Sequence, residues 1–514
     1  MESGWDFDSG TDESEKPSTG TGSASAAGGS VAAGGLSSAP WNEDTGSWLS
    51  VAWKSTAWSD RASSPQADEA ALVYDRGETV CVIGAGASGL VAIKNLRELG
   101  FTVDCYERET NVGGGWNWRH SRSPMYASTH LISSKPTTGF PDFPMPDDWP
   151  DYPSHAQVNE YLGRYAEHFG LREHIWFGTE VSSVVPVDGD RWEVTTRPTG
   201  GGRERVSRYA AVVVANGHNW SPKLPTYEGM DDFKGELVHS SSYKDASTLR
   251  NRKVLVVGAG NTGCDIAVEA ATHAIRCWHS SRRGYWYAPK FMFGRPTDQI
   301  NDGFARRLPL RLRQWMFART LSLTVGDLTR YGLPKPDHRI YETHPIVNSQ
   351  LPYFIGHGGI IPTPDIARFD WDEVELTDGR RINPDLVIFA TGYLPRFEFL
   401  GGDLLDPDAD GRPRLHLHTL SRRYPTLAVA GMIQGDFGLF PLVHWQTAMI
   451  ARWLRLREAD PVRAGQFWSK VTGPGEQRWT RARVKDSTRH WFEVDHNVYL
   501  RALERVLGEW ETAR

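Results

Sequence analysis

Two glycine motifs of the same form lie in this chain of 514 residues, and each directly follows a short β-branched run. Residues 84–89 read GAGASG, and residues 258–263 read GAGNTG. Gly-x-Gly-x-x-Gly between a buried strand and a helix binds the pyrophosphate of a dinucleotide, because the bare backbone approaches the phosphates and the helix N-terminus offers unpaired N–H groups. One such motif is weak evidence in a chain with 51 glycines, but two in matching contexts predict two dinucleotide sites.

The residues around the first motif complete a βαβ pattern. Residues 79–83 predict a buried parallel strand, residues 90–99 a helix closed by Gly100, and residues 102–106 a second strand. Glu107 follows that strand, where the ribose hydroxyls of a dinucleotide need a carboxylate acceptor. The first unit therefore predicts an adenine dinucleotide with a free ribose.

The second unit repeats this order with one change at the ribose position. Residues 253–257 and 275–279 predict strands, residues 264–271 predict the helix between them, and the sequence continues as SSRR over 280–283. Guanidinium groups pair with a ribose 2′-phosphate, which a carboxylate would repel. Ser281, Arg282 and Arg283 therefore predict NADPH, with a solvated strand end as the alternative.

Composition narrows the class of protein. A hydrophobic content of 39% allows a large core and two or three domains. The sequence has no apolar run near the 20 or so residues of a spanning helix and no secretory signal, and its four cysteines have no Cys-x-x-Cys spacing, so we expect a cytoplasmic protein with reduced, buried thiols. Residues 1–75 hold 12 carboxylates and 3 bases, the remainder is nearly neutral, and nucleic-acid binding is not expected.

The order of the patterns predicts an α/β fold with two Rossmann-like, three-layer, doubly wound dinucleotide-binding domains, the NADPH domain being inserted in the first one. Strands at 210–215 and 385–390 are both expected to return to the first domain. The expected parts are a disordered tail at 1–75, a first dinucleotide-binding domain at 76–221 and 346–460, which the resemblance described below identifies as the FAD-binding domain, an NADPH-binding domain with a helical insertion at 222–345, and a helical extension at 461–514.

Two segments leave alternatives open. The tail contains five tryptophans, so it is either a plain linker or a segment that docks on the core or on a partner. Residues 306–331 are basic, aromatic and leucine-containing, which suits a helical subdomain beside the active site or a weak membrane-surface helix. Homodimer formation is also left open.

Between the two glycine motifs, residues 233–243 (FKGELVHSSSY) match Phe-x-Gly-x-x-x-His-x-x-x-Tyr/Phe/Trp at every fixed position. With this segment, the chain resembles the class B flavin-dependent monooxygenases, the N- and S-oxygenating flavin monooxygenases and their Baeyer–Villiger relatives. Further matching segments are 113–116, 140–148, 261–265, 281–284 and 390–393. The resemblance runs from about residue 78 to 455.

The resemblance implies roles for individual residues. It implies FAD and NADPH as cofactors, and it assigns Gly235, His239 and Tyr243 to a gating linker and not to acid–base chemistry. No metal is expected. The FAD-binding residues would be Gly84, Gly86, Ser88, Gly89, Glu107, Gly114 and Trp116. The NADPH-binding residues would be Gly258, Gly260, Asn261, Gly263, Ser281, Arg282 and Arg283.

The implied reaction inserts one oxygen atom of O2, through a flavin C4a-hydroperoxide, into a nitrogen or sulfur of a small organic substrate. Tyr243, where typical Baeyer–Villiger enzymes have Trp, favours this over ketone or aldehyde oxygenation, and Ile132 stands where many amine-oxygenating members have an asparagine. A flavoprotein NADPH oxidase or binding module is the third possibility. A thioredoxin-reductase-like enzyme is excluded because the cysteine pair is missing. Residues 435–441 precede a helix expected at 442–456, whose N-terminal dipole would face the flavin.

Overall fold

The computed structural model describes residues 72–188, 190–300, 308–343, 345–474 and 491–511. Most of the predicted tail, with its tryptophans, lies outside the described residues. The predicted boundary at residue 75 was wrong, because β1 (Val73–Asp75) pairs in parallel with β7 (Arg205–Tyr209), and the Arg205 guanidinium lies 4.0 Å from the centre of the Tyr74 ring. These last residues of the predicted tail are part of a sheet.

The first glycine motif follows β2, the middle one of the five parallel strands in a seven-stranded sheet. Strands β23, β8, β2, β3 and β4 of this sheet are parallel, and β21 and β22 add an antiparallel edge. In sheet order the strands are β21 (Leu415–His416), β22 (Leu420–Ser421), β23 (Leu427–Val429), β8 (Ala211–Val214), β2 (Val80–Ile83), β3 (Val103–Tyr106) and β4 (Ile175–Trp176).

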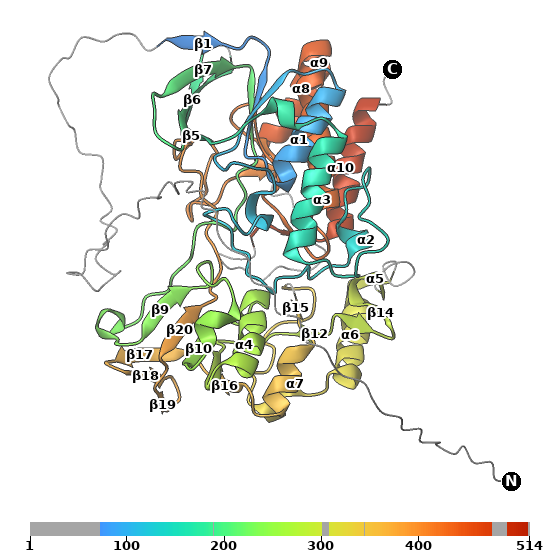
Figure 1. The fold of residues 1–514 in the computed structure, drawn as a ribbon. Helices are drawn as coiled ribbons and strands as arrows, with labels where there is room; N and C mark the ends of the chain where they lie inside the picture. Colours follow the sequence, from blue (N-terminus) through green and yellow to red (C-terminus); the bar gives the residue numbers. More distant parts are fainter. Residues whose placement is uncertain (1–71, 189, 301–307, 344, 475–490, 512–514) are drawn as a thin grey trace, which may run out of the picture. The chain divides into compact units, whose positions relative to one another are not determined.

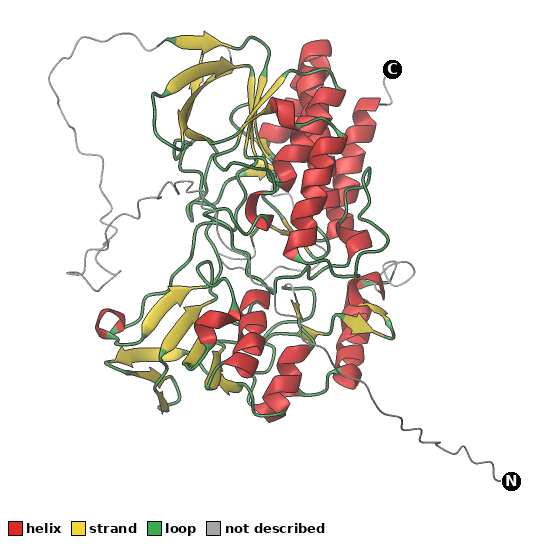
Figure 2. Cartoon of the chain, viewed as in Figure 1, coloured by secondary structure: helices red, strands yellow, loops and turns green. Residues whose placement is uncertain are grey.

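This sheet is the middle of three layers. Val80 and Val82 of β2 point into a core shared with the helices, whereas Cys81 and Ile83 point into a core shared with a second, four-stranded sheet. The alternation follows from the two-residue period of a strand. Figure 2, in which helices are red and strands are yellow, shows these layers. The helices are α1 (Ala87–Glu98), α3 (His155–His168), α8 (Phe440–Ala459) and α10 (His496–Glu511), and the outer sheet runs β1, β7, β6 (Arg191–Pro198), β5 (Thr179–Val187).

The second glycine motif follows the central strand of a five-stranded, fully parallel sheet. Helix α4 (Asn261–His273) and α7 (Gln350–Gly356) cover one face, and a small antiparallel sheet covers the other. The strands in order are β16 (Ile361–Thr363), β11 (Arg276–Ser280), β10 (Lys253–Val257), β20 (Leu386–Phe389) and β9 (Glu236–His239), and the small sheet is β17 (Ile366–Asp370), β18 (Glu373–Leu376) and β19 (Arg381–Ile382).

The strand predicted at 385–390 is present, but its predicted partner was wrong. β20 pairs with β10 and β9 of the second sheet, whereas the strand predicted at 210–215, observed as β8, does pair with β2. All strands of the second sheet fall between β8 and β21 in sequence, so the second domain is inserted in the first, as predicted. Because β16 and β20 belong to it, we propose that the inserted domain continues past β20, beyond the boundary expected at residue 345.

The stretch at 306–331 that was expected to be helical forms α6 and a 3-10 turn where the structure describes it. Helix α6 (Leu310–Thr324) packs Phe317 and Leu321 against a small separate core, while Trp315 and Leu323 are 59% and 88% exposed. None of the helices that the structure describes is long and apolar enough to cross a membrane. The remaining elements are α2 (Lys135–Thr138), α5 (Thr297–Ile300), α9 (Pro461–Thr472), and the strand pairs β12 (Tyr287–Ala288) with β15 (Ile346–Val347), β13 (Phe291–Met292) with β14 (Arg295–Pro296), and β24 (Gln434–Gly435) with β25 (Glu493–Val494) (Figure 1).

All four cysteines are buried thiols outside any disulfide, as predicted. Burial raises the pKa of the Cys277 thiol to about 12 and raises those of Cys81 and Cys105 as well. These thiols are therefore protonated at neutral pH and serve as small apolar side chains of the core.

Candidate cofactor and active site

The first glycine motif makes a turn that only glycine fits. Gly84 has φ +101°, and a Cβ there would lie 2.7 Å from the carbonyl oxygen of Ala215 at the end of β8. A Cβ on Gly89 would lie 1.8 Å from the carbonyl oxygen of Gly84. Helix α1 then starts after Gly86, and among the described residues no side chain caps its first N–H groups. These groups are left to hold an anion, as a pyrophosphate site requires.

Glu107 lies where the sequence predicts a ribose acceptor. It is buried, its Oε2 accepts the Ala85 N–H at 2.7 Å, and its Oε1 accepts the Glu109 N–H at 2.9 Å. Burial raises the pKa of Glu107, while the two backbone donors oppose that shift. A carboxylate oxygen accepts more than one hydrogen bond, so both oxygens keep capacity for ribose hydroxyls.

Glycines from a second segment close the other side of this turn. A Cβ on Gly114 would lie 2.9 Å from the Cα of Gly86, and Gly114 has φ +53°. Gly86, Ser88, Gly114 and Trp116 all line one cavity with Glu107. The structure therefore brings every predicted FAD-site residue except Gly89 to the cavity wall, and Gly89 supports the turn from behind.

The second motif has the same geometry. Gly258 has φ +114°, and a Cβ there would lie 2.5 Å from the carbonyl oxygen of Ala390 at the end of β20. A Cβ on Gly263 would lie 1.9 Å from the carbonyl oxygen of Gly258. Helix α4 begins after Gly260, again with no side-chain cap. The turn is thus a second anion site of the same build.

Two arginines follow β11 beside the second turn. Arg282 is exposed, whereas Arg283 is half-buried with its Nε 3.3 Å from the hydroxyl of Tyr285. Both line the same cavity, and within the described part of the chain neither guanidinium is paired with a carboxylate. Ser281 lies behind them and donates to the Arg283 carbonyl at 2.7 Å, so it shapes the turn. The side chain of Asn261 is also engaged, since its Oδ1 accepts the Val347 N–H at 2.8 Å.

Three residues of the segment at 233–243 were predicted as site residues, and none of the three lines the cavity: they are Gly235, His239 and Tyr243. Gly235 packs under the Phe233 ring, which a Cβ would approach to 2.4 Å. His239 is buried, its Nδ1 accepts the Ser241 N–H at 3.1 Å, and its Nε2 donates to the Gly392 carbonyl at 3.0 Å. Burial lowers the pKa of His239, so it is neutral and ties β9 to the turn at 391–393. Tyr243 donates to Glu269 Oε2 at 2.8 Å.

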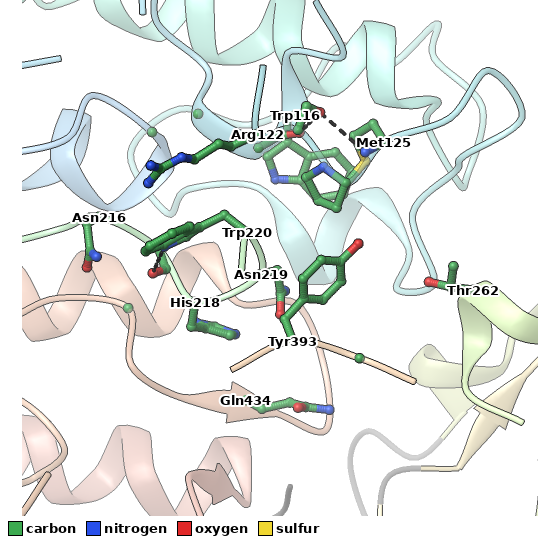
Figure 3. Close-up of a pocket in the computed structure, with 18 of the residues that line it drawn as sticks. Trp116, Arg122, Met125, Asn216, His218, Asn219, Trp220, Thr262, Tyr393 and Gln434 are labelled. Carbon is green, nitrogen blue, oxygen red and sulfur yellow. Dashed lines mark hydrogen bonds between the residues drawn. The ribbon is translucent and has the colours of Figure 1, made fainter. Parts of the chain in front are cut away.

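One cavity of about 1310 Å³ connects both glycine turns. Figure 3 shows Trp116, Met125, Tyr393 and Gln434 around it, with Thr262 contributed by the second domain. A cavity larger than an ordinary small-molecule site, with an uncapped helix N-terminus at each of two places, fits two dinucleotides.

Comparison with known proteins agrees with this geometry. Residues 77–509 match the model of the flavin-binding monooxygenase-like family. The chain belongs to this family. It is 33% identical to flavin-containing monooxygenase 1 of Sus scrofa over 393 residues. The aligned region covers 73% of this chain and 72% of the relative.

Two solved structures show the same fold as this flavin-binding monooxygenase. The S-allyl-L-cysteine S-oxygenase from Allium sativum is 22% identical with a TM-score of 0.57, and the match covers 84% of this chain and 88% of that one. A cyclohexanone-bound cyclohexanone monooxygenase is 20% identical with a TM-score of 0.61 over 84% and 98% of the two chains. Membership of the family makes the monooxygenase an FAD- and NADPH-dependent enzyme that uses O2, and the paired turns fit both cofactors.

Several cavity residues of the monooxygenase were not predicted. Asn219 lies in the wall just after β8. It could have been predicted from the sequence, because ligands bind at the carboxyl ends of parallel strands and a polar residue follows the strand there. Gln434 and Tyr393 were not predicted as site residues either. Phe492, which also lines the cavity, comes from the C-terminal segment of the chain. Ile132 does line the cavity, and the predicted helix at 442–456 begins earlier, as α8 at Phe440, whose first residue is also in the wall.

Proposed function

We propose that this enzyme transfers one oxygen atom of O2 to a nucleophilic nitrogen or sulfur of a small organic substrate. FAD supplies the oxygen chemistry when it is bound, and NADPH supplies the two electrons. In this proposal the first turn with Glu107 holds FAD, and the second turn with Arg282 and Arg283 holds NADPH.

The observation that carries the proposal is the single cavity that joins the two turns. Electrons from the second site reach the first without a protein carrier, and no cysteine lines the described wall. All four thiols lie in the cores of the two domains. An acceptor other than a protein disulfide is therefore required, and O2 is one that needs no further redox group.

The side chains in the cavity wall support a nucleophilic substrate. Trp116, Ile132, Asn219, Tyr393 and Gln434 are neutral groups that exclude water or donate hydrogen bonds without titrating near pH 7. Burial lowers the pKa of His218 to about 4, so this wall histidine is uncharged. A nitrogen or sulfur lone pair attacks without help from a base, so neutral wall residues such as these are sufficient for its oxygenation.

Product analysis tests the proposal. The FAD-loaded enzyme is incubated with NADPH and O2 and with a tertiary amine, a thioether or a cyclic ketone, and mass spectrometry identifies any N-oxide, S-oxide or ester. NADPH consumption and hydrogen peroxide release are measured in the same reactions. We expect oxygenated amine or thioether in proportion to NADPH consumed, and none from the Gly258→Ala variant.

Other outcomes would point elsewhere. An ester as the main product would make the enzyme a Baeyer–Villiger oxygenase. NADPH consumption matched by hydrogen peroxide, with no product from any of the three substrates, would indicate an NADPH oxidase. Binding of both cofactors without consumption of NADPH would indicate a binding module.

A further inference from the structure

One segment of the FAD domain, residues 123–138, forms a large part of the cavity wall. Its sequence position, between the first glycine unit and α3, assigns it to the FAD domain. The segment includes α2 and Ile132. Its wall residues include Ser123, Met125, Thr129, Ile132, Ser133 and Thr138.

Backbone hydrogen bonds attach one edge of the segment to the FAD domain. Leu131 N donates to the Pro153 carbonyl at 2.9 Å, Lys135 N donates to the Asp151 carbonyl at 2.8 Å, and the Thr129 carbonyl accepts from His155 N at 2.9 Å. These bonds fix the segment along its neighbour in sequence and leave its other edge for different partners.

The other edge is held by side chains of the inserted NADPH domain. Lys244 Nζ donates to the carbonyls of Ser123 and Met125 at 2.7 and 3.2 Å. Tyr126 donates to Asp265 Oδ2 at 3.1 Å, and its ring lies in the core of the second domain. Helix α4, which begins at the second glycine turn, carries Asp265, so this bond links the two sites directly.

Two further contacts come from Lys290 and Asp298, which follow β12 in the second domain. Lys290 Nζ donates to the Leu131 carbonyl at 3.2 Å, next to the wall residue Ile132. Asp298 of α5 accepts the Ser134 N–H at 2.6 Å and the Thr137 hydroxyl at 2.7 Å through the same Oδ2. Figure 1 shows α2 and α5 next to one another.

Asp298 thus caps α2 from another domain. Ser134 is the residue before α2, and its own side chain caps nothing there. A carboxylate on the N–H groups of a helix start is a strong, charge-assisted contact. Removing it leaves the Ser134 N–H without the acceptor that orders this end of the segment.

We propose that Asp298 and Lys290 are positioning residues, which make the wall segment 123–138 of the FAD site follow the state of the NADPH domain. The proposal rests on the assignment of NADPH to the second glycine turn. Both side chains lie outside the cavity wall. In this proposal they transmit a conformational change at the NADPH site to the wall of the FAD site.

Hydrogen exchange measured by mass spectrometry tests the proposal without using activity. The FAD-loaded protein is compared with and without NADP⁺, and peptides over residues 128–138 and 255–266 are followed. In the parent we expect NADP⁺ to slow exchange in both peptides. In Asp298→Ala we expect Ser134 exchange to rise about tenfold and the response of 128–138 to disappear, while 255–266 still responds.

Matched variants separate this role from a general loss of stability. Asp148→Ala removes an exposed carboxylate and should behave as the parent. Lys290→Met keeps the length of the side chain and should weaken the response of 128–138, and Asp298→Asn, which retains an acceptor oxygen, should restore part of it. A full response of 128–138 in both Asp298→Ala and Lys290→Met would overturn the proposal. No response of 255–266 in the parent would overturn the NADPH assignment and the proposal with it.

Discussion

Gly258 packs against the carbonyl oxygen of Ala390 so closely that a Cβ on Gly258 would lie 2.5 Å from it. Gly84 and Ala215 repeat this relationship in the first domain, at 2.7 Å. In each domain the first glycine of the motif therefore contacts the end of the neighbouring parallel strand, β20 in one and β8 in the other. The contact ties each nucleotide turn to its own sheet.

The variant Gly258→Ala tests this contact. The left-handed φ and the clash together should lower the free energy of unfolding by about 2–5 kcal/mol and weaken NADP⁺ binding more than FAD binding. Gly326, at φ +82° with no atom within 4 Å of a Cβ, is the matched control, and Gly326→Ala should cost about 1–2 kcal/mol. Denaturant unfolding and titration of each nucleotide measure these effects. Equal costs for the two variants would contradict the clash.

Substitution of Arg282 tests which cofactor the second site selects. If its guanidinium pairs with the 2′-phosphate, Arg282→Ala should raise the KM for NADPH about tenfold and leave the KM for NADH nearly unchanged. Arg276→Ala, which removes an exposed guanidinium from β11 of the same sheet, is the control. An equal rise for both nucleotides would refute the assignment of Arg282.

Asp436 makes the stability of the chain depend on pH. Burial, with the nearby Asp495 carboxylate, raises the pKa of Asp436 from 3.8 to about 7, and its Oδ1 accepts the His496 N–H at 2.7 Å. Between these two pKa values the folded chain holds a proton that the unfolded chain has lost, so this contribution to stability is present below about pH 4 and is lost as pH rises through about 7.

The variant Asp436→Asn isolates that contribution. Its stability relative to the parent should increase by about 1.4 kcal/mol per pH unit between about pH 4 and 7, and then stay constant. Urea unfolding of both proteins at four pH values measures the difference, with Asp148→Asn as an exposed control. A difference that does not change with pH would show that Asp436 titrates at its ordinary value.

Membrane-surface association of α6 stays a prediction, and the structure gives it specific residues. Leu312, Trp315, Met316 and Leu323 are exposed within one arc of the helix, and Leu310–Thr324 has three arginines and no carboxylate. Trp315→Ser combined with Leu323→Ser should lower sedimentation with phosphatidylglycerol vesicles at least about tenfold. Val462→Ser removes an exposed side chain from α9 and should have no effect. No binding of the parent at low salt would refute the prediction.

The elements near the glycine motifs were predictable because short-range patterns determine them. A buried β-branched run, a glycine turn and a helix follow one another within about 20 residues. The observed positions of β2, β3, β10 and β11 accordingly match the predicted ones to within one residue at each end. The assignment of β20 to a sheet was not predictable in this way. Residues 211–214 and 386–389 are equally apolar and both end at a polar turn, so only tertiary contacts decide which sheet each strand joins.

The predicted site was incomplete for a similar reason. Glu107, Arg282 and the glycines occupy fixed positions in a motif, whereas Gln434, Tyr393 and Phe492 reach the cavity through contacts made far along the chain. The four-stranded sheet over the first domain has no motif of its own, and it was missed with its first strand, β1.

The pairing of β25 with β24 places Phe492 in the wall of the cavity beside the His218 ring, with ring centres 5.2 Å apart, and α10 then packs on α8. The first glycine turn is translated more than 400 residues before this wall residue. Phe492 is therefore added to the cavity only after nearly all of these residues have been made, and we expect a nascent chain halted before it to have a cavity without this side chain.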